Sequence, residues 1–512
     1  MPLSIQTILR PSLCLAALLS TARAEEPAPV LTLHDLIVGA VNSNLELSAR
    51  RLEPEIQQNR LDGSYGAFEP VFIAGYSYSS SERPQNYVSN ALGGRFAPIY
   101  EEDVWRWQTG ISGRLPTGTQ YELLTGVDRT TNTSIYTPGN GFSTVSALYV
   151  PEYVSTTTLT ITQPLLRDFG FSANLAEIRL QRSTLRSSRH ELEATAQRIL
   201  RDVAAAYYEM VFAQENIRVK EEAVRVAEAL ARDNQRRLDE GRMAPIDVSQ
   251  AKSRVSEANE ELLIARNFLA QRRNTLRELT RDNFSFEDAP FTVDPAFVVR
   301  EAPEIEPETA LRSLFEHNPT YLASLELVEA EDVRVAYAKN QLWPRVDLKA
   351  SLGYTGLNDG WTRAYDDYGT RDQPNYSIGV VVNVPIGNRA GRYRVIEANN
   401  RKRQALFNLK RAEITLLSAF DSARRDIDNA LERNRLVQDT VKLAAETLDA
   451  QQRLLGSGKT TSYEVSQAQR DLSQARSREL ATLVDLNKAV AQLQFVIGTL
   501  DQHLRVHLDA QG

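Results

Sequence analysis

Apolar residues in two long stretches of the chain recur in alternating steps of four and three residues. The stretches are 199–227 and 416–444. This spacing places the apolar residues on one face of a helix and is typical of a coiled-coil seam. The surrounding segments 171–240 and 392–455 contain neither Pro nor Gly. Each segment therefore predicts one helix, roughly 100 Å long at ~1.5 Å per residue.

Each long helix is followed by a turn and a second uninterrupted helical segment. We predict helical hairpins at 171–282 and 389–498. An offset of 217 residues aligns the two, so that Val248-Ser249-Gln250-Ala251 matches Val465-Ser466-Gln467-Ala468. Asn434 is the one polar residue in the second apolar stripe. Equal patterns at a fixed offset indicate an internal repeat.

The segments before the hairpins align at a different offset, 274 residues, which pairs Asn44 with Asn318 and Pro70 with Pro344. In each half a helix of about 25 residues is expected first, then a β region. We predict two structural repeats at 25–283 and 306–500. A linker rich in Pro and acidic residues joins them at 284–305, and residues 501–512 form a C-terminal tail.

The β regions show alternation with a period of two, for example at Tyr376, Ile378, Val380 and Val382. Strands are expected at about 71–82, 150–163, 345–356 and 375–386. Stretches of about ten alternating residues are the signature of membrane-barrel strands, but soluble sandwiches alternate too, and both interpretations stay open on this pattern. The aromatic residues suited to the girdles of a barrel are Tyr76, Tyr78, Trp343 and Tyr354.

The first β region is longer than the second because it contains an insertion at 84–146. Two strand-like segments in this insertion, 105–115 and 121–129, flank Pro116-Thr117-Gly118. They fit either a large external loop or an extra membrane hairpin. With an external loop the chain would supply four strands to the barrel, and with an extra hairpin it would supply six.

Neither number closes a membrane barrel, because the smallest have about eight strands. An open sheet in lipid would leave unpaired edges. Several copies must then share one barrel. The expected fold class is an α+β membrane protein, in which a shared barrel continues into a coiled-coil barrel of long helices.

Residues 1–24 have the features of a secretory signal peptide. Arg10 precedes an apolar stretch at 13–19, and Ala22-Arg23-Ala24 provides the cleavage site. Removing the segment removes Cys14, the only cysteine, and lowers the net charge from −7 to −9 because it carries two arginines and no acid. An acidic chain without cysteine does not suit nucleic acid, disulfides or thiol chemistry. After residue 24 no run of 18 apolar residues predicts a transmembrane helix.

The ordered set of motifs resembles the TolC family of outer-membrane efflux and secretion channels. The motifs are Leu31-Thr32-Leu33, Gln163-Pro164-Leu165-Leu166, Ala204-Ala205-Ala206-Tyr207-Tyr208, Ala213-Gln214-Glu215-Asn216 and Ile497-Gly498-Thr499-Leu500. The resemblance covers almost all of 31–500, and the insertion at 84–146 departs from it.

The resemblance implies a homotrimer with a barrel of twelve strands, or eighteen with the extra hairpin. It implies a passive exit duct of a tripartite efflux pump or type I secretion system. Its implied partners are outer-membrane lipid, a periplasmic adaptor (membrane fusion) protein and an inner-membrane pump or ABC transporter.

The turns of the two hairpins are expected to be the periplasmic tips, where an adaptor docks and opens the channel. The residues concerned are Gly241, Arg242, Ala244, Pro245, Gly456, Gly458, Lys459 and Ser462. Glycine suits turn backbone that other residues resist. Simple helix-hairpin turns would contain the same residues, so both interpretations stay open.

Asp449 lies about two helical turns before the second tip, where the family places acidic rings around its constriction. By the repeat offset Asp449 corresponds to Arg232, next to Asp233. Crossed charges among these three aperture candidates would hold a closed state. A solvated helix face explains them equally well, since exposed ion pairs contribute only about 0–1 kcal/mol.

Two further sequence features give little evidence of a binding or catalytic site. The segment 456–461 resembles a phosphate-binding loop, but the required first glycine is Arg453. The five histidines are scattered. We therefore expect no catalytic residue, cofactor or metal, and no enzyme activity. The alternative functions are a periplasmic adaptor or structural coiled-coil protein, and a soluble enzyme with a helical arm.

Overall fold

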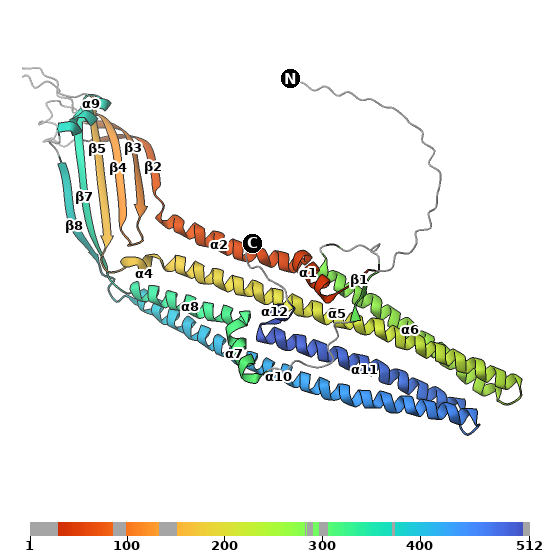
Figure 1. The fold of residues 1–512 in the computed structure, drawn as a ribbon. Helices are drawn as coiled ribbons and strands as arrows, with labels where there is room; N and C mark the ends of the chain where they lie inside the picture. Colours follow the sequence, from red (N-terminus) through yellow and green to blue (C-terminus); the bar gives the residue numbers. More distant parts are fainter. Residues whose placement is uncertain are drawn as a thin grey trace, which may run out of the picture.

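The computed structural model shows an elongated chain with a β-sheet at one end and long helices extending away from it (Figure 1). The residues it describes are 29–84, 99–132, 151–281, 283, 290–295, 306–370 and 374–504. The expected signal peptide at 1–24 and most of the expected tail at 501–512 lie outside the described residues. The predicted linker at 284–305 is described only at 290–295.

Two helical hairpins form the stem. The first consists of α5 (Ala176–Asp239) and α6 (Pro245–Thr280), and the second of α10 (Arg389–Gly456) and α11 (Ser462–Ile497). The 64 residues of α5 span about 96 Å at ~1.5 Å per residue. The apolar stripes face the interior, because Ile199, Val203 and Met210 are buried in α5, and Phe420 and Ile427 are buried in α10.

The helix predicted at the start of each half is in fact two helices. α1 (Leu33–Ser43) ends at Asn44 and α2 (Leu45–Ser64) begins there. In the second half, α7 (Pro307–His317) ends at Asn318 and α8 (Pro319–Asn340) follows. Both asparagines have extended backbone, which no helix interior accommodates.

Each of these asparagines makes the same two hydrogen bonds. The Oδ1 atom accepts from a backbone N–H in the next helix, that of Leu47 at 3.0 Å or Tyr321 at 3.1 Å. The Nδ2 atom donates to a carbonyl at the far end of a hairpin, that of Leu279 or Val496, both at 3.0 Å. The cap is a typical asparagine role. The second hydrogen bond joins the break between the two short helices to the last turn of the hairpin's second helix.

Two apolar cores lie at the level of these breaks. One joins α1, α5, α6 and α11, and its fully buried residues include Leu200, Tyr207 and Leu276. The other joins α7, α10 and α11 around Leu314 and Leu486. Tyr207 also donates a hydrogen bond to the carbonyl of Asp294. Burial raises the pKa of Tyr207, and that of Tyr208 to about 12, so both remain neutral donors.

The sheet has six antiparallel strands in the order β2-β3-β4-β5-β7-β8. They are β2 (Val71–Pro84), β3 (Ile99–Arg114), β4 (Gln120–Asn132), β5 (Glu152–Pro164), β7 (Arg345–Asn358) and β8 (Pro374–Asn383). The described parts of the insertion at 84–146 are mainly β3 and β4, which pair over their whole length and join the main sheet. Within one chain the insertion is therefore an extra hairpin rather than an external loop.

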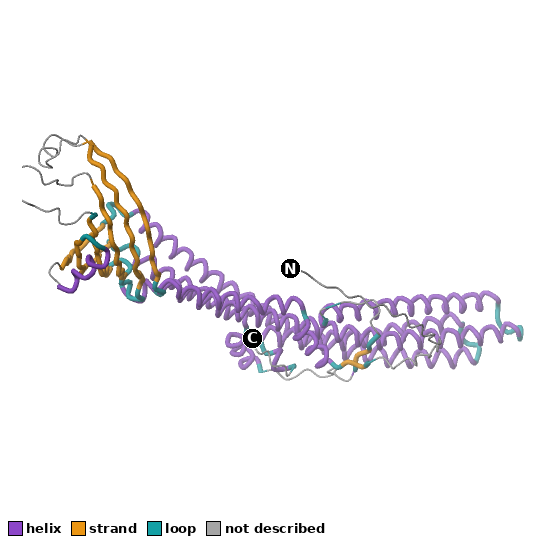
Figure 2. Tube along the Cα trace, turned by 90° about the horizontal axis from the view of Figure 1, so that it is seen from above, coloured by secondary structure: helices purple, strands orange, loops and turns teal. Residues whose placement is uncertain are grey.

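Short elements lie along the stem, at the junction of stem and sheet, and between β7 and β8. They are β1 (Val30–Leu31), η1 (Tyr65–Phe68), α4 (Gly170–Asn174), β6 (Thr292–Val293), α9 (Trp361–Asp366), η3 (Asp367–Thr370) and α12 (Leu500–His503). β1 and β6 pair in parallel and tie the chain's beginning to the linker. Figure 2 shows the curved strands at one end and the aligned helices at the other.

The sequence predicts no transmembrane helix, yet α11 passes a test of length and composition for one, with a mean hydropathy of 1.2 over its most apolar 18 residues. Half of that window is buried inside the molecule. α11 packs against α10 and α5. Packing within the stem thus accounts for its apolar composition.

Candidate functional site

The sheet has one apolar face and one polar face. Strand register shows this directly, because paired residues across the six strands form rows that share a face. One row is apolar throughout and reads Phe72, Ile111, Leu123, Leu159, Leu352, Tyr376. The next row faces the opposite side and reads Val71, Ser112, Glu122, Thr160, Ser351, Ser377. We call the two sides the apolar face and the polar face.

The described residues leave much of the apolar face exposed. On β8, Tyr376 is 81% exposed and Ile378 is 76% exposed. On the polar face, Arg106 and Asp128 form a two-pronged ion pair with a closest approach of 2.7 Å. The polar face therefore suits contact with water. The apolar face, with its large exposed side chains, suits contact with a non-aqueous phase.

Neither edge of the sheet is paired with another described segment of the chain. β2 and β8 are the outermost strands. Because all five strand pairs are antiparallel, β2 and β8 run in opposite directions. A second copy can therefore add its β2 to this β8 and continue the antiparallel pattern without a break.

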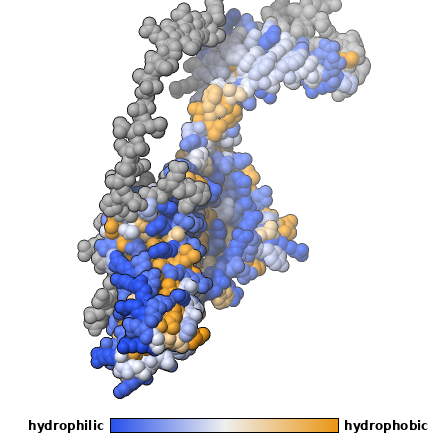
Figure 3. All heavy atoms as spheres, turned by 90° about the vertical axis from the view of Figure 1, so that its right-hand side faces the viewer, coloured by the Kyte–Doolittle hydropathy of each residue, from blue (hydrophilic) through white to orange (hydrophobic). Residues whose placement is uncertain are grey.

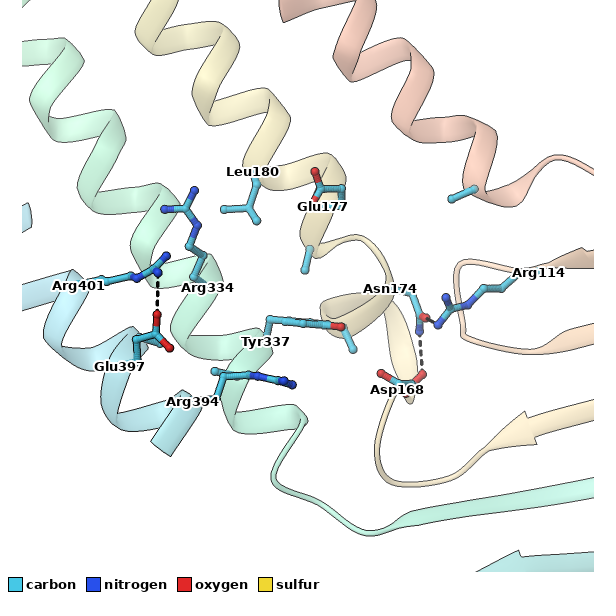
Figure 4. A pocket seen from close by; sticks show the side chains of 15 residues that line it. Arg114, Asp168, Asn174, Glu177, Leu180, Arg334, Tyr337, Arg394, Glu397 and Arg401 are labelled. Atoms are coloured by element: carbon cyan, nitrogen blue, oxygen red, sulfur yellow. Dashed lines mark hydrogen bonds and ion pairs between the residues drawn. The ribbon is translucent and has the colours of Figure 1, made fainter. Parts of the chain in front are cut away.

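A cavity of about 400 Å³ lies where the sheet meets the stem (Figure 4). Arg114 reaches it from β3 and donates to the Asn174 side chain at 2.5 Å. On the stem side, Glu397 and Arg401 of α10 form an ion pair at 2.6 Å. Asn174 also donates to the carbonyl of Asp168 at 2.9 Å. The bond between Arg114 and Asn174 holds the end of β3 against α4 and so joins the extra hairpin to the end of the stem next to the sheet.

The hairpin turns end their helices in the same way. Gly241 and Gly458 have φ angles of +71° and +70°, a conformation that favours glycine. The N–H groups of Arg242 and Lys459 then reach back to carbonyls of the preceding helix, at 2.7 Å and 2.9 Å. This is the Schellman termination of a helix. Seen from the tips, the surface is mostly hydrophilic with smaller apolar patches (Figure 3).

Seven of the eight tip residues expected to dock a partner are exposed, namely Gly241, Arg242, Ala244, Pro245, Gly456, Gly458 and Lys459. Ser462, the eighth, is only 5% exposed. Its hydroxyl accepts a hydrogen bond from the Nδ2 atom of Asn234 at 2.8 Å. Ser462 thus joins the two hairpins to each other and does not present a surface.

Sequence reasoning missed the residues that hold the two tips together. Asn234 is fully buried between the hairpins. Arg237 of α5 donates to the carbonyl of Leu455 at 3.3 Å and forms an ion pair with Asp233 at 2.8 Å. The signal for Asn234 was present, since one further four–three repeat beyond Ala227 reaches it.

The structure does not bring the three aperture candidates together. Asp449 pairs with Arg453 on its own helix, and Arg232 pairs with Glu228 at 3.5 Å. Asp233 binds Arg236 and Arg237. Within one chain, therefore, the corresponding positions of the repeat carry local ion pairs, and the crossed pair of Asp449 with Arg232 is not formed.

Among the residues that the structure describes, no three His, Cys, Asp or Glu side chains are grouped as a metal site would require.

The chain is similar to known proteins over most of its length. The profile of the family described as "Outer membrane efflux protein" matches residues 132–280 and 310–499. Cobalt-zinc-cadmium resistance protein CzcC of Cupriavidus metallidurans is 26% identical over 324 residues, 62% of this chain and 70% of that protein. Outer membrane protein TolC of Vibrio cholerae is 24% identical over 325 residues, 62% of this chain and 71% of that protein.

The fold is also similar to that of solved structures. The crystal structure of CusC matches with a TM-score of 0.67 at 14% identity, over 91% of this chain and 92% of CusC. At this identity the match concerns the fold, and it covers both the sheet and the stem.

Proposed function

Because the chain belongs to the outer membrane efflux protein family, we propose that it is the passive exit duct of a tripartite efflux pump or a type I secretion system. It is an outer-membrane protein with a periplasmic helical extension. The observation that carries the proposal is the division of the sheet into an apolar and a polar face. A closed barrel built from this sheet presents its apolar face to lipid and lines a water-filled duct with its polar face.

Three copies share the barrel. The unpaired edges support this association, because β2 of one copy continues β8 of the next in antiparallel order. Six strands from each of three copies make eighteen. A barrel of this size leaves an aqueous channel, whereas about eight strands leave room only for side chains or one small ligand.

The apolar face has the limits expected of a lipid-facing band. From the row of Phe72 to that of Tyr78 and Trp105, six residues at roughly 3.4 Å each give about 20 Å, near the ~25 Å of membrane barrels. The tyrosine and tryptophan form a girdle at one end. Beyond them Asp103 and Glu101 occupy the same face. Because these side chains are charged, this part of the face must contact water.

The hairpin tips are the docking surface for a periplasmic adaptor. Besides the seven exposed tip residues, Ile246 and Tyr463 are 61% and 54% exposed. The 217-residue offset places these two at the same position of the two hairpins. Large exposed apolar residues beside Arg242 and Lys459 offer an adaptor both burial and charge.

In the trimer, Asp449 and Arg232 act between copies rather than within one. Exposed ion pairs along one helix contribute little to stability. Asp449 and Arg232 can therefore exchange their local partners for residues of the neighbouring copy. Three acidic groups around an axis would form a ring of negative electrostatic potential that a passing solute must cross. Adaptor docking at the tips, a few turns away, then opens the constriction.

Ion conductance of the purified protein in planar bilayers tests the duct. We expect a small conductance from the wild type and a clear increase from Asp449→Ala. The control is Asp421→Ala, which removes an equivalent exposed pair with Arg425 (3.0 Å) from the same helix, far from the tip. Membrane-inserted oligomers with no conductance in any variant would contradict the duct. An equal effect of both substitutions would contradict only the constriction at Asp449.

A further inference from the structure

The segment that connects β7 to β8 folds back onto the apolar face of the sheet. Its helix α9 sits over Ser155, whose hydroxyl donates to the carbonyl of Ala364 at 2.5 Å. Two tyrosines beside it reach threonines of the sheet. The hydroxyls of Tyr365 and Thr125 lie 3.3 Å apart, and those of Tyr368 and Thr157 lie 3.4 Å apart. α9 therefore provides partners for the few hydroxyls on a face that is otherwise apolar.

The position of α9 is fixed by close packing as well as by these bonds. A Cβ atom on Gly356 would lie 2.0 Å from the carbonyl oxygen of Ala364. Ser155 and Val127 beneath the helix are completely buried, and Ala364 is too. The helix is thus docked against the strands rather than projecting beyond them.

A groove of about 480 Å³ runs beside α9 over strands β2 to β4. Tyr76, Trp107, Trp361 and Tyr365 form its aromatic walls. The ring centroids of Trp107 lie 5.2 Å from those of Tyr76 and 4.9 Å from those of Trp361, so the walls are continuous. The floor consists of smaller residues and strand backbone, namely Ala74, Gly75, Gln108, Thr109, Thr125 and Gly126.

This groove has the properties of a binding site for an apolar chain. Its volume falls within the range of about 300–1,000 Å³ typical of ligand sites. None of its lining residues is charged. The hydroxyl of Thr125 is already engaged by Thr157 at 2.7 Å and by Tyr365. A neutral lining with aromatic walls suits an apolar chain better than a charged ligand.

We propose that the groove between α9 and strands β2 to β4 binds one acyl chain of a membrane lipid. The inference rests on the proposed function, since it requires that the apolar face contact lipid. The groove opens on that face, between the apolar row of Phe72 and the girdle of Tyr78 and Trp105. A lipid there has its headgroup near the girdle and its chain beside Trp107 and Trp361.

The test uses tryptophan quenching by lipids with brominated acyl chains, on the full-length mature protein in nanodiscs. All four tryptophans are described by the structure, and two of them, Trp107 and Trp361, line the groove. The other two, Trp105 and Trp343, lie outside it. A variant with W105F and W343F reports the groove, and one with W107F and W361F reports the rest of the membrane face.

In the first background, Ala74→Phe fills the floor of the groove and should reduce bromine quenching at least twofold. The matched control is Ala350→Phe, on the same face but outside the groove, which should leave quenching unchanged. Native mass spectrometry of the same variants should show about one retained lipid fewer per chain for Ala74→Phe alone.

Equal quenching and equal lipid counts in the two variants would overturn the proposal. Retention of lipid headgroup sugars without chain quenching would overturn it too, by identifying a carbohydrate site. The second background separates this failure from failure of the proposed function. If Trp105 and Trp343 are quenched while Trp107 and Trp361 are not, only the groove assignment fails. If no tryptophan is quenched, the apolar face does not meet lipid, and the barrel proposal fails as well.

Discussion

The stem and the sheet place their apolar residues in opposite ways. In the stem, Val203 and Met210 face other helices and are completely buried. In the sheet, the most regular apolar row lies on an uncovered face, and even its central members Leu159 and Leu352 are exposed. Hydrophobic periodicity alone therefore shows that an element has an apolar face. It does not show whether that face packs against the rest of the protein or contacts lipid.

The difference has a structural consequence. The core of the stem is packed within one chain, because α5 and α10 each pack against the return helix of their hairpin and α5 also packs against α11. On α10, however, Phe407, Ile414 and Leu443 stay exposed. In the part of the chain that the structure describes, the sheet has two unpaired edge strands and an apolar face that is largely exposed. We infer that the apolar face of the sheet makes membrane insertion obligatory, and that its edges require pairing with further copies.

The largest effect should come from a charge on the apolar face of the sheet. Ile378→Arg places an arginine on the exposed apolar face of β8. The cost per copy of an arginine facing lipid ranges from about 1 kcal/mol near an interface to about 2–4 kcal/mol at the bilayer midplane. We expect loss of the oligomer from outer-membrane fractions. Ser377→Arg, one residue earlier on the polar face, is the control and should be tolerated. Equal outcomes would mean that the two faces do not meet different phases.

A cavity in the stem should destabilise the protein without preventing insertion. Leu276→Ala removes a completely buried side chain from the core around α5 and should lower the free energy of unfolding by about 2–5 kcal/mol. Thermal unfolding followed by circular dichroism measures this loss. Leu263→Ala, on the exposed side of the same helix, is the control. Loss of membrane insertion in Leu276→Ala would contradict the division of roles between stem and sheet.

The two asparagine breaks should contribute less, and equally. Asn44→Ala or Asn318→Ala removes a helix cap, typically ~1 kcal/mol, and leaves a buried carbonyl without its donor. We expect matching decreases in melting temperature for the two variants. Asn399→Ala serves as the control, because Asn399 bonds only to the carbonyl of Val395 on its own helix. Unequal effects of the two breaks would contradict their structural equivalence.

Much of this architecture is readable from the sequence, because long uninterrupted segments and strict alternation are strong signals. The breaks at Asn44 and Asn318 were missed because apolar periodicity continues across them. Pro319 did mark the second break, since the residue before a proline avoids helical backbone. Extra strands β3 and β4 stayed undecided, because a hairpin adds two strands and preserves the direction of the chain.

Other features depend on contacts that no local pattern contains. Ser462 and Asn234 meet only because two hairpins pack at one register. α9 has six residues, which is too few for helical periodicity to show which side is buried. The aromatic groove also combines Trp361 with Trp107, residues that are far apart in the chain.

The central claim is that copies of this chain join edge to edge through β2 and β8 to close one outer-membrane barrel. Single-particle electron microscopy of the protein purified from outer membranes tests it most directly. We expect a three-fold particle with eighteen strands, in which β3 and β4 belong to the barrel wall and the stem forms a continuous tube. A monomer with an open sheet, or a barrel of twelve strands with β3 and β4 outside the wall, would contradict it.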